Sequence, residues 1–187
     1  RLGFSDSGSA PAGDTTRVAY DLLAKGFGAG TNGPLIVVSA VDSPEGFTQM
    51  EAVQKALAQT PGVANVSGVI RSPNNNAALV IVTPTTAPQD QATSDLVEHL
   101  RSSVIPAATK GTALAPKVGG FTAVGIDFST YLADRLPLFI GLVLALSFLL
   151  LLVVFRSVLV PIKAVIMNVL SIAAAYGVVV AVFQWGW

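Results

Sequence analysis

Residues 136–155 form a run of twenty residues without a charged side chain, and Arg156 ends this run. A second apolar run covers residues 164–183. An α-helix needs about 20 apolar residues to cross a hydrocarbon core of roughly 30 Å, and a helix satisfies its backbone polar groups within the segment. The alternative, a buried helical hairpin of a soluble protein, fits this length and lack of charge poorly. The sequence therefore predicts two transmembrane helices in a cell membrane.

The connection between the two runs, residues 156–163, contains the only charged residues after Arg135, namely Arg156 and Lys163. Cytoplasmic connections of membrane proteins carry an excess of Lys and Arg. These two residues therefore determine the predicted topology, with residues 156–163 in the cytoplasm and residues 1–135 outside it. Trp185 and Trp187 would then lie at the outer membrane interface, which aromatic side chains prefer.

The charge distribution separates a polar part from an apolar part. Of eleven Lys and Arg residues, two follow residue 135, so the first part has nine against eleven Asp and Glu, a net charge of −2. The mean hydropathy of +0.64 thus reflects the tail. No basic patch indicates nucleic acid, and the absence of Cys excludes disulfides and thiolate metal sites. The chain begins without Met and stops just after a predicted span, so we expect it to be a piece of a larger polytopic protein.

Residues 34–123 predict an α+β domain of the ferredoxin-like, split βαβ type. Strands are expected at 34–42, 63–70, 77–83 and 117–122, with helices after 43 and after 88. The second and third strands should form a hairpin across the turn at residues 72–76. The resulting order is β-α-β-β-α-β, in which two helices cover one face of an antiparallel sheet. Val37, Val80 and Ile81 should lie in the central strands, where a charge is costly to bury.

Two further segments flank this domain. Residues 1–33 contain an amphipathic helix that should run from Thr15 or Thr16 to about Lys25, where Gly26 ends it. Residues 124–135 should be helical and continue into the first span, residues 136–155, without a flexible linker. Movement of the outer domain would then reach the first membrane helix directly.

Several short motifs resemble one family in their order and spacing. They are GFSDSG at residues 3–8, AYDLL at 19–23, GFG at 26–28 with NGP at 32–34, and FRSVLVP at 155–161. Together with an outer split βαβ domain followed by two membrane helices, they resemble the resistance–nodulation–division (RND) superfamily, and within it the MMPL branch of actinobacterial membrane proteins. The resemblance covers nearly the whole chain and is closest to the C-terminal half, with its second porter domain and eighth and ninth membrane helices.

The resemblance implies a proton-driven exporter of lipids or other amphiphiles. Its partners would be the bilayer, the rest of the same protein, including a homologous porter domain, and a hydrophobic or lipid substrate. In the family an Asp-Tyr pair in the fourth membrane helix of each half handles the proton. All carboxylates of this chain precede Leu136, so neither span contains such a group. The alternative is an extracytoplasmic binding or assembly domain of a non-transporting relative, such as a protein-export accessory subunit.

The second run contains three polar residues, Asn168, Ser171 and Tyr176. Polar side chains in membrane helices face neighbouring helices, where they form hydrogen bonds. Asn168 and Ser171 are three residues apart and share a helix face. We therefore expect this face to pack against a neighbouring membrane helix. The alternative is that it lines the transport core.

Asp127 and Asp134 lie seven residues apart just before the first run, close to one helix face. They would form an acidic rim at a substrate entrance, or would be solvated charges at a helix end. His99 is the only histidine, and no second His or Cys ligand lies at helical spacing from it. We therefore expect His99 to be a surface residue rather than a metal ligand. The sequence contains no nucleotide-binding loop and no supported catalytic triad. We therefore expect neither enzymatic activity nor a cofactor.

Overall fold

The structure is a computed structural model that describes residues 6–183. The chain divides into two units, of which the first ends at Tyr131 and the second begins at Leu132. The predicted interface residues Trp185 and Trp187 lie outside the described residues, as do residues 3–5 of the first family-like motif.

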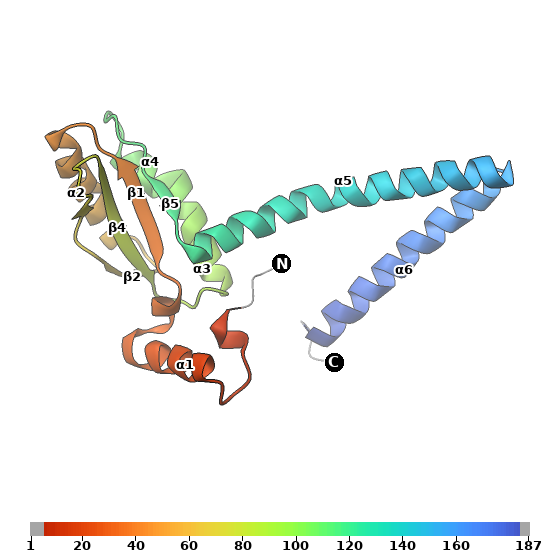
Figure 1. Ribbon diagram of the computed structural model, residues 1–187, viewed down its shortest axis with the longest axis horizontal. Helices are drawn as coiled ribbons and strands as arrows, with labels where there is room; N and C mark the ends of the chain where they lie inside the picture. Colours follow the sequence, from red (N-terminus) through yellow and green to blue (C-terminus); the bar gives the residue numbers. More distant parts are fainter. Residues whose placement is uncertain (1–5, 184–187) are drawn as a thin grey trace. The chain divides into compact units, whose positions relative to one another are not determined.

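The first unit contains a mixed α+β fold with an antiparallel sheet (Figure 1). Its central strands, β1 and β4, pair antiparallel with Val37 opposite Val80. The order across the sheet is β2-β4-β1-β5, and the short β3 also pairs with β4. The strands are β1 (Leu35–Ala40), β2 (Val63–Val66), β3 (Ile70–Arg71), β4 (Ala77–Pro84) and β5 (Lys117–Gly119).

Two strands differ from the sequence-based expectation. The single strand expected at 63–70 is divided into β2 and β3. Between them Ser67 pairs with Ile81 through two hydrogen bonds: its amide donates to the Ile81 carbonyl over 2.8 Å, and its hydroxyl accepts from the Ile81 amide over 2.9 Å. β5 ends at Gly119 because Gly120 adopts φ of +100°, a backbone conformation that a strand does not continue.

The pleat of the sheet gives it one buried and one exposed face. Along β1, Leu35 and Val37 are fully buried, whereas the alternate residues Ile36 and Val38 are 38% and 39% exposed. In β4 Val80 is buried but Ile81 is 37% exposed. The expectation that Ile81 is buried together with Val37 and Val80 is therefore wrong, because adjacent residues in a strand point to opposite faces.

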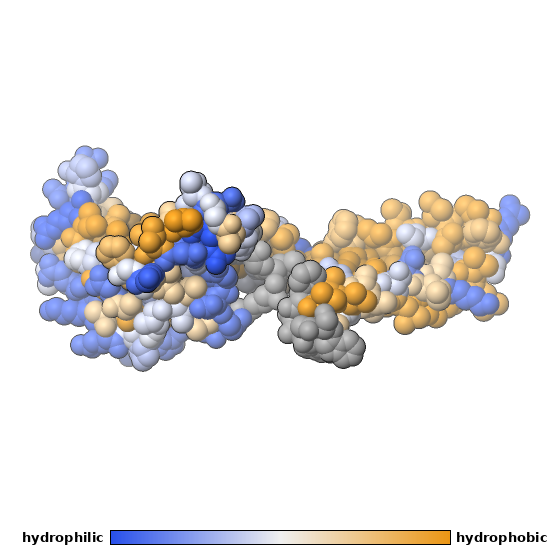
Figure 2. Space-filling view, turned by 90° about the horizontal axis from the view of Figure 1, so that it is seen from below, coloured by the Kyte–Doolittle hydropathy of each residue, from blue (hydrophilic) through white to orange (hydrophobic). Residues whose placement is uncertain are grey.

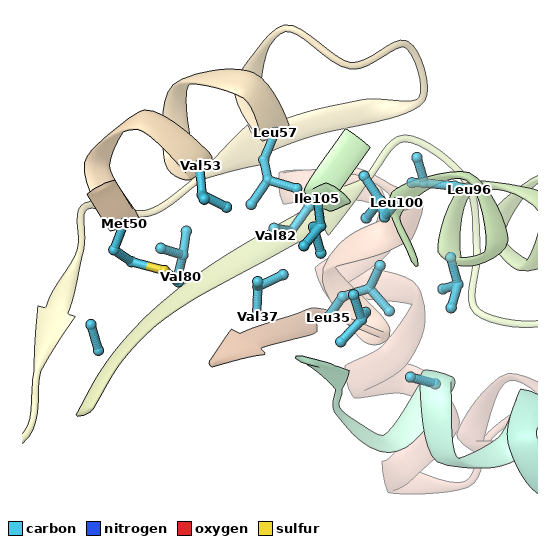
Figure 3. Packing of buried hydrophobic residues seen from close by; sticks show 14 of the residues in the cluster. Leu35, Val37, Met50, Val53, Leu57, Val80, Val82, Leu96, Leu100 and Ile105 are labelled. Carbon is cyan, nitrogen blue, oxygen red and sulfur yellow. The ribbon is translucent and has the colours of Figure 1, made fainter. Parts of the chain in front are cut away.

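The buried face is covered by α2 (Pro44–Ala58) and by a helical segment made of α3 (Gln91–His99), a π-helix (Leu100–Val104) and α4 (Ile105–Ala108). Side chains of α2 and of the sheet meet in one core (Figure 3). Its fully buried members Leu57, Met50 and Leu100 are unbranched or γ-branched residues that fill the space above the β-branched valines of the strands.

The N-terminal segment forms α1 (Thr15–Phe27) between two short 3₁₀ helices, η1 (Ser7–Ser9) and η2 (Ala29–Asn32). The helix begins at Thr15 as expected, but it runs to Phe27 and so passes through Gly26, which was expected to end it after about Lys25. The residue that ends it is Gly28, whose φ of +94° favours glycine.

The second unit contains the end of α5 (Phe121–Phe155) and all of α6 (Leu159–Phe183). Both helices are long and apolar enough to cross a membrane, and the apolar window of each is 0% buried within the chain. A core helix of a soluble protein would be covered within the chain, so these two helices are candidate membrane spans. Hydrophobic side chains cover this part of the surface, whereas the first unit has a mixed surface (Figure 2).

Candidate functional site

The first turn of α5 is fixed to the sheet of the first unit. Gly120 brings the chain so close to β1 that a Cβ atom there would lie 2.8 Å from the Pro34 carbonyl oxygen. Thr122 and Ala123 are buried, and the Thr122 hydroxyl donates to the carbonyl of Gly33 over 3.2 Å. The start of α5 is thus held where β1 begins.

A bidentate ion pair holds the second turn of α5. The Arg101 guanidinium donates to both carboxylate oxygens of Asp127, one of them over 2.9 Å, and to the Val118 carbonyl over 2.8 Å. Arg101 therefore joins three elements, the π-helix, β5 and α5. The hydrogen bonds with Asp127 raise the pKa of Arg101, so its charge is retained over the accessible pH range.

The other predicted rim residue, Asp134, is exposed on α5 beyond the boundary of the first unit. Asp127, in contrast, is engaged with Arg101, although its side chain is still 56% exposed. The structure thus gives the two carboxylates different surroundings.

α5 is one helix of 35 residues and contains Pro137 in its interior. At 1.5 Å per residue it is about 52 Å long, which exceeds a hydrocarbon core of roughly 30 Å. Residues 136–155 account for about 30 Å of this length. The remaining turns, from Phe121 to Arg135, contain the charged residues of the helix that precede the span, namely Asp127, Asp134 and Arg135. The helical connection expected at 124–135 is therefore continuous with the span and begins three residues earlier.

The connection between α5 and α6 is shorter than expected. Only residues 156–158 are non-helical, because α6 begins at Leu159 and already includes Lys163. Arg156 has φ of +48°, and its amide donates to the Leu152 carbonyl over 3.0 Å. Such a left-handed residue commonly ends a helix, although glycine is favoured there. Arg156 therefore lies in the connection between the helices, and Lys163 lies near the start of α6.

The polar residues Asn168, Ser171 and Tyr176 all lie on α6, and all three are exposed in this chain. The structure does not bring them against α5. Their exposure is compatible with both interpretations of the sequence, packing against other helices and lining the transport core.

The described residues offer no reactive constellation. His99 is exposed on α3, as the sequence indicated. Residues 6–183 contain no group of three His, Cys, Asp or Glu side chains that could hold a metal ion.

Sequence reasoning missed the role of Arg101. Its partner Asp127 lies 26 residues away, a separation at which no helical or strand periodicity applies. The π-helix, which carries Arg101, was also missed, because i→i+5 hydrogen bonding has no simple signal in composition.

Comparison with known families gives one family model, described as "MMPL family", that matches residues 12–186. Among curated proteins, the chain is 40% identical to "Membrane protein YdfJ" of Bacillus subtilis over 189 residues, covering 99% of this chain and 25% of that protein. It is 34% identical to "Mycolic acid-containing lipids exporter MmpL11" of Mycolicibacterium smegmatis, over 91% of this chain and 18% of that protein. The same identity and the same shares hold for "Heme uptake protein MmpL11" of Mycobacterium tuberculosis.

A solved structure, "Mycobacterial membrane protein MmpL11D2", matches 46% of this chain and 99% of its own length, with 20% identity and a TM-score of 0.36. The chain thus spans a quarter or less of the length of the curated relatives named here.

Proposed function

This chain belongs to the MMPL family, and from that membership we propose that it forms part of a proton-driven exporter of lipids or other amphiphiles. Its relative from Mycolicibacterium smegmatis is named as an exporter of mycolic acid-containing lipids, and the one from Mycobacterium tuberculosis as a heme uptake protein. A lipid and a heme are both amphiphilic, so an amphiphilic cargo would be common to these two relatives. The two helices that are long and apolar enough to cross a membrane support a role in transport across a bilayer.

The proposed topology places residues 1–135 outside the cytoplasm of the cell membrane and the turn at Arg156 inside it. The two cations of this region, Arg156 and Lys163, support it because cytoplasmic connections are enriched in Lys and Arg. Asp127 and Asp134 would then lie above the outer membrane surface, where Asp134 contributes to an acidic rim.

We assign the first unit to the ferredoxin-like porter type. The β-α-β-β-α-β order and the antiparallel arrangement β2-β4-β1-β5 support the assignment. The exposed face of the sheet carries Ile36, Val38 and Ile81, which are apolar and more than a third exposed. A homologous porter domain elsewhere in the same protein would cover such a face and leave an apolar passage beside it.

The chain's contribution to export is mechanical coupling, and the observation that carries this proposal is the continuity of α5. One helix runs from the Arg101–Asp127 ion pair to Phe155. Neither span contains a carboxylate or a histidine, the groups from which proton relays are built. Proton-driven movement of other membrane helices would therefore reach the first unit through α5, with Asn168 and Ser171 of α6 packing against those helices.

The test is a flexible Gly-Ser insertion after Arg135 in the full-length protein. Both apolar spans survive this change, so membrane insertion and abundance should be unchanged, whereas export of a fluorescent lipid should be lost. The matched control places the same insertion in the exposed turn after Asn75, which should leave export intact. Normal export by the Arg135 insertion would contradict mechanical coupling and favour a binding or assembly domain.

A further inference from the structure

A cavity of about 620 Å³ lies in the first unit, between the N-terminal segment and the first residue of α5. Its volume falls within the range of about 300–1,000 Å³ that small-molecule sites occupy. One part of its wall is polar and is formed by Asp6, Ser7, Thr16, Tyr20 and Asn32. None of its lining residues within the described chain is Lys or Arg.

The other part of the wall is apolar and consists of Ala19, Leu23 and Phe121. Leu23 and Phe121 are 42% and 70% exposed, so a ligand in the cavity would remove apolar surface from water. Val124 lies one turn after Phe121 and is 59% exposed, so the apolar surface continues along α5 toward its membrane span. A wall that is polar at one side and apolar at the other matches an amphiphile.

A hydrogen-bond chain fixes one oxygen of Asp6 and leaves the other unused. The Tyr20 hydroxyl donates to Gln89 Oε1 over 3.2 Å, and Gln89 Nε2 donates to Asp6 Oδ1 over 3.0 Å. The Gly8 amide also donates to Oδ1, again over 3.0 Å. Asp6 Oδ2 is buried and has no hydrogen-bond partner within residues 6–183.

A buried acceptor without a donor destabilises the fold, and more so when it is charged. Asp6 lines the cavity, so a ligand bound there can supply the donor that its carboxylate lacks. Two carboxylates act on the polar side of the cavity: burial raises the pKa of Tyr20, the hydrogen bond with Gln89 lowers it, and the negative charges of Asp6 and Asp90 raise it further. A negative site with an unused acceptor favours a cation that carries N–H groups.

We propose that this cavity binds an amphiphile with a primary ammonium head group, which donates to Asp6 Oδ2 while its alkyl chain lies on Leu23 and Phe121. The binding site itself does not depend on transport. Only the identification of its ligand with an exported substrate rests on the proposed function.

The experiment measures binding to the whole chain in nanodiscs by calorimetry, with empty nanodiscs as the blank. Octylammonium should bind saturably at one site, at least about tenfold more tightly than octyltrimethylammonium, which has the same charge but no N–H donor. It should also bind more tightly than octanol, a neutral donor, and octyl sulfate. Equal binding of octylammonium and octyltrimethylammonium, or tighter binding of octanol or octyl sulfate, would overturn the proposal.

Variants locate the site. Asp6→Asn keeps the acceptor for Gly8 but removes the charge, and should weaken octylammonium binding about tenfold. Asp21→Asn removes an exposed carboxylate of α1 that pairs with Arg17 and does not line the cavity, so it should bind octylammonium as the unchanged chain does. Unchanged binding by a folded Asp6→Asn chain would refute the site. Should that variant not fold, the comparison of ligands on the unchanged chain still decides. Because none of these measurements involves export, a failure of the site is separate from a failure of the proposed transport.

Discussion

Removal of the Arg101 guanidinium should loosen the first turns of α5. Arg101 makes three hydrogen bonds, two to Asp127 and one to the Val118 carbonyl. The side chains of the pair are 34% and 56% exposed, so solvent screening limits the ion pair to about 1 kcal/mol, the upper end for exposed pairs. The Val118 carbonyl would lose its partner as well, which adds about 1 kcal/mol. Arg101→Met should therefore cost about 2 kcal/mol, and Asp127→Ala about 1 kcal/mol.

Amide hydrogen exchange of residues 121–131 measures this opening in the whole chain. Under fast reclosing, exchange should accelerate about 30-fold in Arg101→Met and about fivefold in Asp127→Ala. The double variant should match Arg101→Met, because the two substitutions remove a shared interaction. Unchanged protection of residues 121–131 in Arg101→Met would refute the reasoning, and so would strictly additive effects in the double variant.

The chain offers a matched control in Arg17 and Asp21. This pair has the same side-chain exposures, 34% and 56%, but lies within α1 at a spacing of four residues. Arg17→Met and Asp21→Ala should therefore leave exchange at residues 121–131 unchanged. An equal acceleration in these variants would mean that the loss of any exposed ion pair loosens the unit.

Three further predictions concern topology, packing and backbone. Since the chain has no Cys, Asn75→Cys should react with a membrane-impermeant thiol reagent in intact cells, and Ser157→Cys only after permeabilisation. The reverse labelling would invert the topology. Val80→Ala should lower the free energy of unfolding by about 2 kcal/mol, and the exposed Ile81→Ala by about 1 kcal/mol, in denaturant titrations followed by circular dichroism; equal losses would contradict the observed pleat. Gly120→Ala should cost about 2 kcal/mol in the same assay because of its positive φ and the nearby carbonyl, and a neutral effect would show that the backbone relaxes.

The features that could be predicted from the sequence are those with a local period. The prediction of the two spans needed only the absence of charge over 20 residues. The order of strands and helices could be predicted from the spacing of apolar residues and from the turn residues between them. The same reasoning failed at Ile81, because two adjacent apolar residues do not reveal which of them faces the core. It also failed at residues 67–69, where an interruption of the strand depends on the Ser67–Ile81 pairing.

The candidate sites depended on contacts between distant segments, so they were harder to predict from the sequence. Asp127 was singled out for its place before the first span, yet its bond with Arg101 required knowledge of where the π-helix lies relative to α5. Asp6 has its nearest side-chain partner, Gln89, 83 residues away. Neither pairing follows from composition or periodicity, because each depends on how the fold brings two distant segments of the chain together.

The stiffness of α5 depends more on its surroundings than on its sequence. Pro137 has no amide hydrogen, so the carbonyl of Ala133 loses its helical partner, and a proline within a helix costs about 3 kcal/mol. The helix nevertheless continues, because an apolar bilayer offers the following residues no hydrogen-bond partners other than their own backbone. Before Pro137 no such constraint applies, and the helical turns are instead held by Thr122, Ala123 and the Arg101–Asp127 pair. In the proposed mechanism, coupling between the first unit and the membrane span would therefore depend on those contacts. Their loss should weaken coupling even though every residue of the span is unchanged.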